Sequence, residues 1–259
     1  MKKKIILKSS ILAVAAGLSV FAINSVFADE LPVQFMGVND FHGALEQTGT
    51  ARLEGETVKN AGTAPLLATY LNDSQKDFET ENAGTPNASI RVQAGDMVGA
   101  SPANSALLQD EPTVKVFNEM NFEYGTLGNH EFDEGLGEFN RIMKGEAPTP
   151  GQFNKIVDEY PHEASKQEVV IANLVDKDTN KIPFDWKPYT IKEIPVNDKT
   201  VKVGFIGVVT TEFPNLVLRK NHEQYRVLDE AESIAKYARE LNDQGVHAIA
   251  VLAHVAATS

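Results

Sequence analysis

The stretch Gly128-Asn129-His130-Glu131-Phe132-Asp133 follows a short apolar run, Tyr124–Leu127, and it decides how the rest of the chain is interpreted. The apolar run predicts a buried strand, and the glycine lets the chain turn sharply where that strand ends. Asn129 offers a neutral amide oxygen to a cation. His130 has an acid three residues later, Asp133, which can orient the imidazole ring and stabilise its charged form. The stretch therefore predicts a chemical role at the carboxyl end of a strand.

Polar side chains also follow three other predicted strands. Asp40 and His42 come after the first of them, and because residues two apart in an extended backbone share a face, both can converge on one cation. Asp96 follows the second strand behind a glycine, and His254 ends the last one. Each motif alone has an ordinary interpretation, as a surface pair, a helix cap or a core histidine. Four polar strand ends together indicate one metal centre.

The pattern along the chain predicts an α/β fold, because short apolar runs alternate with segments of helical period. Strands are predicted at Val33–Val38, Ser89–Gln93, Tyr124–Leu127, Glu168–Leu174, Tyr189–Ile194, Val201–Val209 and Val246–Ala253. Helices are predicted at Ala64–Gln75, Thr113–Met120, Glu134–Lys144 and Asp229–Gln244. Two polar stretches without periodicity, Thr48–Thr63 and Lys76–Asn87, are predicted to be surface loops.

The first 28 residues have the features of an export signal. A lysine cluster at residues 2–4 precedes an apolar run over Ile11–Ile23, and Ala28 ends a segment with small residues at the cleavage positions. The run is short for a membrane span, although a retained anchor is the alternative. We therefore predict a signal peptide at residues 1–28, a mature domain at residues 29–259 with no stable membrane span, and a secreted or cell-surface location, in a bacterium.

Composition excludes several classes of protein. The chain has 259 residues, a formal net charge of −12 and no cysteine. Sites that need thiolate ligands are excluded, and so is a fold held by disulfides. The acidity argues against a nucleic acid duplex as partner, because a duplex reader needs a basic face. Phosphate-bearing small molecules stay compatible with this charge if bound cations attract them.

The combined motifs resemble the metallophosphoesterase (calcineurin-like phosphoesterase) superfamily. Within it, Asn39-Asp40-Phe41-His42-Gly43 together with the stretch at residues 128–133 is similar to the secreted bacterial 5′-nucleotidase branch. The resemblance covers nearly all of the mature chain, from Pro32 to Thr258. It implies a four-layer α/β/β/α sandwich, incomplete at the C-terminus.

The resemblance also implies a dinuclear site. Five residues would bind two divalent cations: Asp40, His42, Asp96, Asn129 and His254. Asp96 would bridge both cations, and His130 supported by Asp133 would form a catalytic dyad. Because the donors are oxygen and nitrogen alone, manganese, zinc, iron, cobalt and magnesium all suit them.

The chain departs from the family pattern in one respect. Family members carry a Gly-His-x-His segment after the equivalent of His254, and none of the remaining histidines, His162, His222 and His247, has that context. We therefore expect a partial catalytic domain that lacks the family's C-terminal nucleotide-binding domain. This stretch alone should have weak hydrolase activity or none, because removed ligands weaken metal binding.

The function that the resemblance implies is hydrolysis of nucleotides such as AMP to nucleoside and phosphate. A 2′,3′-cyclic-nucleotide 2′-phosphodiesterase and a UDP-sugar hydrolase use the same ligands and are alternatives. A secreted binding module without catalysis is a third. Outside these motifs, Phe184, Trp186 and Tyr189 form an aromatic cluster that could line a pocket, although packing is the preferred interpretation.

Overall fold

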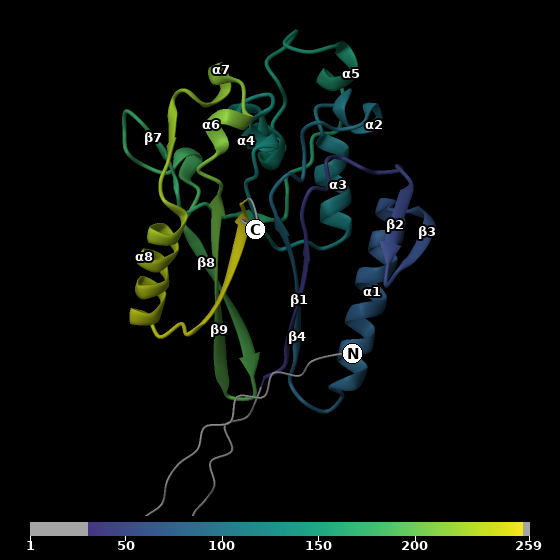
Figure 1. Ribbon diagram of the computed structural model, residues 1–259, viewed down its shortest axis with the longest axis vertical. Helices are drawn as coiled ribbons and strands as arrows, with labels where there is room; N and C mark the ends of the chain where they lie inside the picture. Colours follow the sequence, from purple (N-terminus) through teal and green to yellow (C-terminus); the bar gives the residue numbers. More distant parts are fainter. Residues whose placement is uncertain (1–30, 256–259) are drawn as a thin grey trace, which may run out of the picture. The chain divides into compact units, whose positions relative to one another are not determined.

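The computed structural model describes residues 31–255, and the predicted signal peptide lies outside them. A parallel sheet contains four strands in the order β1 (Val33–Val38), β4 (Ala88–Ala94), β5 (Tyr124–Thr126) and β6 (Glu168–Val169). Parallel strands need crossover connections, and these are supplied by helices on one face of the sheet (Figure 1). All four carboxyl ends therefore lie at the same edge.

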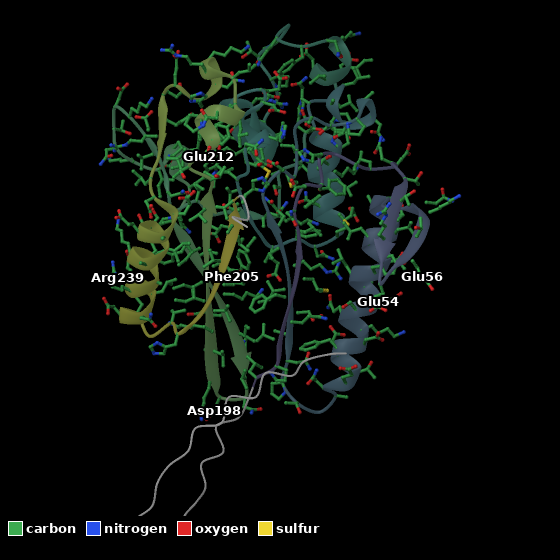
Figure 2. The ribbon with its side chains drawn as sticks, viewed as in Figure 1. Glu54, Glu56, Asp198, Phe205, Glu212 and Arg239 are labelled. Atoms are coloured by element: carbon green, nitrogen blue, oxygen red, sulfur yellow. The ribbon has the colours of Figure 1, made fainter. Side chains whose placement is uncertain are left out.

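A second sheet has the order β11 (Ala248–His254), β9 (Lys199–Val209), β8 (Tyr189–Val196). β11 runs parallel to β9, whereas β8 and β9 form an antiparallel hairpin whose turn contains Asp198 (Figure 2). The two sheets pack through apolar side chains, and the ring of Phe205 on β9 stacks on that of Tyr124 on β5 at 4.5 Å.

Helices cover the outer faces of both sheets. Against the first sheet pack α1 (Ala64–Glu81), α3 (Glu111–Glu119) and α4 (Leu136–Lys144). Against the second packs α8 (Glu230–Asp243), through the fully buried Leu241. Figure 1 shows α1 and α8 on opposite outer sides with the sheets between them. This order of layers confirms the predicted α/β/β/α architecture.

Short elements complete the described chain. Two antiparallel pairs join β2 (Gly49–Leu53) to β3 (Glu56–Ala61) and β7 (Leu174–Asp176) to β10 (Tyr225–Val227). Single helical turns are α2 (Ala103–Ala106), η1 (His130–Phe132), α5 (Lys155–Asp158), η2 (Pro183–Asp185), α6 (Phe213–Leu216) and α7 (Arg219–His222). Among the described residues, no helix is both long and apolar enough to cross a membrane.

The loop prediction for Thr48–Thr63 was wrong, and that for Lys76–Asn87 was wrong as far as Glu81, whereas residues 82–87 form the predicted loop. Residues 48–63 contain the β2–β3 hairpin, whose turn residues Glu54 and Gly55 both have positive φ, at 49° and 89°, as a type I′ turn requires. Figure 2 places Glu54 and Glu56 at the exposed end of this hairpin. Lys76 begins the last part of α1, which continues to Glu81, because a helix whose outer face meets water needs few apolar residues.

The predicted strand Glu168–Leu174 is divided in two. The N–H of Val170 still donates to the carbonyl of Gly125 in the first sheet at 2.9 Å, and the backbone then leaves this sheet, because the N–H of Ile171 donates to the carbonyl of Lys187 at 2.8 Å. The N–H of Ala172 then donates to the carbonyl of Gly207 in the second sheet at 2.7 Å. An apolar run can thus cross between two sheets, which the sequence pattern does not distinguish from one long buried strand.

Candidate metal centre

The predicted site residues converge where β1, β4 and β5 end beside the end of β11. Backbone hydrogen bonds fix two of the loops together: the N–H of Asp40 donates to the carbonyl of Gly95 at 3.1 Å, and that of His42 donates to the carbonyl of Asp96 at 3.0 Å. The parallel register places these loops at one edge of the sheet, as the sequence predicted.

Asp96 lies at the middle of this cluster. Its Oδ2 is 3.1 Å from Nε2 of His254 and 3.8 Å from Nε2 of His42. Two groups of metal-ligating atoms, each lying within 4.8 Å of one another, contain it: one with His42 and His130, the other with Asp40 and His254. One carboxylate therefore belongs to two adjacent candidate cation sites.

His42 and His254 both direct Nε2 at the centre. Nδ1 of His42 lies 2.9 Å from the carbonyl oxygen of Gly99, and Nδ1 of His254 lies 2.9 Å from that of Ala94. A carbonyl only accepts, so each Nδ1 carries a proton, and Nε2 is the nitrogen that each ring can offer to a cation. This is the arrangement of metal-binding imidazoles, and the donor set fits divalent cations.

Asn129 occupies the same edge. It is half-buried and lines a cavity of about 280 Å³ together with Asp40 and His254. All five residues predicted as ligands are therefore brought together.

His130 and Asp133 form a hydrogen-bonded pair beside this cluster. His130 Nδ1 is 2.9 Å from Asp133 Oδ2, which also accepts the N–H of Ala100 at 2.9 Å. The ring of His130 lies edge-on to that of His42 at 4.8 Å. Burial opposes the charged imidazole, but the bond to Asp133 and the nearby carboxylates outweigh it and raise the pKa of His130.

Electrostatics keep Asp96 ionised although it is only 3% exposed. Burial alone would raise its pKa, but hydrogen bonds from His254 and from the backbone N–H of His130 at 2.8 Å lower it. In turn, the bond to Asp96 is the main cause that raises the pKa of His254 to about 9.

Glu131 is a residue whose role the sequence analysis missed. The residue is 2% exposed, and its carboxylate accepts four backbone N–H groups, from Asp96 at 2.9 Å, Met97 at 2.7 Å, Val98 at 3.4 Å and Gly128 at 2.5 Å. Burial raises its pKa to about 7, the charge of Asp96 adds to this, and the backbone bonds oppose it. Glu131 thus fixes the loop that carries Asp96 against the turn after β5.

Three site residues have left-handed backbone conformations, with φ of 52° at Asp40, 49° at His42 and 53° at Asp96. Such conformations are costly for residues with a Cβ and cluster at functional sites. Gly128 permits the close approach, because a Cβ there would lie 2.2 Å from Oδ1 of Asp96.

The other three histidines make structural contacts. Nδ1 of His162 pairs with Glu111 at 2.7 Å, the ring of His222 packs on Phe213, and His247 is exposed beside Asn242. These contacts lie outside the two candidate cation groups.

Proteins of similar sequence support the resemblance to the metallophosphoesterases. The chain is 54% identical over 233 residues to the cell wall protein Lmo0130 of Listeria monocytogenes, covering 90% of this chain and 28% of that protein. It is 38% identical over 231 residues to endonuclease YhcR of Bacillus subtilis, covering 88% of this chain and 17% of that protein. A 2′,3′-cyclic-nucleotide 2′-phosphodiesterase/3′-nucleotidase of Salmonella typhimurium is 30% identical over 178 residues, covering 64% of this chain and 24% of that protein. The chain thus spans less than a third of each of these relatives, and no family model matches it.

Solved structures share the fold. The calcineurin-like phosphoesterase YfkN from Bacillus subtilis superposes with a TM-score of 0.59 at 24% identity, covering 87% of this chain and 64% of that one. A 5′-nucleotidase precursor from Thermus thermophilus gives 0.59 at 24% identity, covering 85% and 36%. From its motifs, relatives and fold, the chain belongs to the calcineurin-like metallophosphoesterase superfamily.

Proposed function

We propose that this protein is a metal-dependent phosphoesterase that hydrolyses nucleoside 5′-monophosphates such as AMP, releasing nucleoside and phosphate. The observation that carries the proposal is the position of Asp96, shared by two groups of ligating atoms. A carboxylate that can bridge two cations suits the separation of about 3.5–4 Å found in two-metal phosphoesterase sites.

Five residues would hold the cations: Asp40, His42, Asp96, Asn129 and His254. When bound, two divalent cations supply a clamp for phosphate oxygens and a nucleophile from water near neutral pH. The ionised Asp96 and the Nε2 atoms of His42 and His254 are the groups that such cations need, and a bound cation would take the place of the proton that His254 shares with Asp96. The cations also supply the positive charge that a chain with net charge −12 needs in order to attract a phosphate ester.

His130 and Asp133 would act on the leaving group. Asp133 accepts the Nδ1 proton, so Nε2 of His130 is the atom that can deliver a proton to the leaving oxygen. The raised pKa of His130 favours the protonated form that this step requires. Because Asp133 is itself anchored by the N–H of Ala100, the ring keeps one orientation.

The test separates cation binding from the dyad. In a form of the protein that turns over AMP, His130→Ala should keep the manganese content and thermal shift of the unsubstituted protein and lose about 10²–10⁴-fold in AMP turnover. Asp96→Asn should lose both. His247→Ala, at an exposed histidine away from the centre, is the matched control and should change neither. Unchanged turnover in His130→Ala would remove the dyad from the mechanism.

We further expect residues 29–259 by themselves to bind cations weakly, because they contain no Gly-His-x-His segment. Metal titration of this stretch should give a shallow, unsaturated curve at concentrations that fill an intact dinuclear site. AMP turnover by this stretch at the rate of intact 5′-nucleotidases would contradict the expectation.

A second candidate reaction is hydrolysis of 2′,3′-cyclic nucleotides. It is favoured by the name of the Salmonella relative, 30% identical over 178 residues. AMP, 2′,3′-cyclic AMP and a UDP-sugar, compared at equal concentration, distinguish the candidates. Absence of turnover with all three, at normal metal content, would indicate a binding module instead.

We also propose a location at the cell surface. The predicted signal at residues 1–28 and the name of the Listeria relative, a cell wall protein, support it. Fractionation of cells that produce the protein should place it in the wall or medium fraction, shortened at its N-terminus. Recovery of uncleaved protein in the cytoplasm would contradict the proposal.

A further inference from the structure

A cavity of about 230 Å³ lies at the free edge of the first sheet, lined by residues from α4, the start of β6 and the segment around η2. It shares no lining residue with the candidate metal centre. Its walls include Asn140, Gln167, Phe184 and Trp186. The proposed hydrolysis uses none of the side chains that line this cavity.

A buried amide at this cavity has an unsatisfied oxygen. Asn140 is 8% exposed, and within residues 31–255 its Oδ1 accepts no hydrogen bond. The amide of Gln167 instead faces the first sheet, where its Nε2 donates to Sδ of Met97 at 3.3 Å. A buried polar atom without a partner costs about 1–3 kcal/mol, so folds seldom keep one beside a cavity without a use. Amide side chains match ligands that present hydrogen-bond donors and acceptors.

Aromatic rings form another wall. Phe184 and Trp186 lie 5.1 Å apart at 53°, and Trp186 meets Phe139 of the core at 6.0 Å. Both are half-buried, with the core behind them and the cavity beside them. Tyr189, which the sequence grouped with them, instead packs on Tyr237 of α8.

The backbone of this wall is strained. Phe184 and the adjacent Asp185 both have left-handed conformations, with φ of 57° and 61°. Consecutive non-glycine residues in this region are costly, and such strain persists where it positions groups for function.

The rim carries balanced charge, with Lys144 and Lys187 against Glu168 and Asp185. Lys187 is paired with Glu168 at 3.0 Å. A phosphate or another anion gains little electrostatic binding free energy from such a rim, whereas the binding of an uncharged ligand is not weakened by it.

We infer that this cavity is a second binding site, for an uncharged planar nitrogen heterocycle of nucleobase type. The aromatic wall supplies a stacking surface, and the amide of Asn140 supplies the hydrogen-bonding edge. The inference does not rest on the proposed hydrolysis, since no catalytic group takes part in it.

Trp186 makes the test direct, because it is the one tryptophan in the 259-residue sequence. Titration with adenosine should quench its fluorescence in a saturable manner. Asn140→Leu, similar in size but without hydrogen-bonding atoms, should weaken the binding about tenfold. Asn242→Leu on the exposed end of α8 is the matched control and should bind adenosine normally. Benzyl alcohol, a ring without an amide-type edge, should bind more weakly than adenosine.

Two further measurements distinguish binding in this cavity from binding at the metal centre and from a purely structural role of Asn140. His130→Ala should bind adenosine normally, and Asn140→Leu should unfold at the same or a higher temperature, because its polar atom is unsatisfied. Absence of saturable quenching, equal binding by Asn140→Leu, or loss of binding in His130→Ala would overturn the inference. A lower unfolding temperature for Asn140→Leu would also overturn it, by assigning the amide a structural role.

Discussion

At the scale of the residue, sequence predicts a role where the signal is local, and it misses a role that rests on contacts made far along the chain. The grouping of Asp40, His42, Asp96, Asn129 and His254 could be predicted from sequence because each follows or ends an apolar run. Glu131 could not be identified in this way. It acts by accepting backbone N–H groups of a loop about 35 positions earlier, and sequence spacing does not report that contact.

Glu131→Gln should destabilise the protein. The glutamine amide would direct its N–H donors at the backbone N–H groups of Asp96 and Gly128. A backbone N–H cannot accept a hydrogen bond, so these bonds would be lost. Loss of these bonds in a buried site should cost about 3 kcal/mol, which lowers the unfolding temperature by roughly 6–12 °C in a domain of this size. Calorimetry checks the value. Glu134→Gln, at an exposed neighbour, should unfold like the parent protein, and an equal effect in both would contradict the assignment.

The pH dependence of the metal-free protein should report on His254. Its pKa is raised from 6.5 to about 9, chiefly by the hydrogen bond to Asp96. The folded state therefore binds the proton more tightly than the unfolded state. The resulting stability is complete below pH 6.5 and is lost as pH rises through about 9.

Chemical denaturation of chelator-treated protein over this range measures that loss. His254→Gln should flatten the decline, whereas His247→Gln, at an exposed histidine, should retain it. A decline of equal size in both variants would show that another group is responsible.

Whole elements were predicted well where local pattern and tertiary packing agree. β1 has the predicted bounds, and α8 differs from its prediction by one residue at each end. Predictions were wrong where partners decide the structure. β3 of the β2–β3 hairpin is almost wholly exposed, and the run after Glu168 changes sheets, so hydrogen-bond partners determine both segments.

α8 illustrates how one side chain can hold an element in place. Leu241 is fully buried, and Gly204 of β9 makes room for it, because a Cβ there would lie 2.8 Å from a methyl carbon of Leu241. Leu241→Ala should cost about 2–5 kcal/mol by leaving a cavity between the helix and the second sheet. Urea unfolding checks this. Arg239→Ala on the exposed face (Figure 2) should stay within about 0.5 kcal/mol of the parent protein, and a similar loss would contradict the packing argument.

At the scale of the molecule, the candidate centre connects the two sheets. Asp40 and Asp96 follow strands of the first sheet, whereas His254 ends β11 of the second. Without cations, the connection at this edge includes the contact of 3.1 Å between His254 and Asp96. Cations held by residues of both sheets would add bonds that unfolding, or separation of the sheets, must break.

Removal of divalent cations should therefore loosen β11 selectively. In the described chain both β11 and β8 pair with β9 alone, but β8 contributes no predicted ligand. Manganese at about 100 times its dissociation constant should slow hydrogen exchange in β11 by up to ~100-fold relative to chelator-treated protein. Exchange in β8 should change less, because none of the residues that would hold the cations belongs to this strand. Equal protection of both strands would indicate general stabilisation instead of a link between the sheets. If the link passes through the Asp96 carboxylate, Asp96→Asn should abolish the difference in exchange between manganese-loaded and chelator-treated protein.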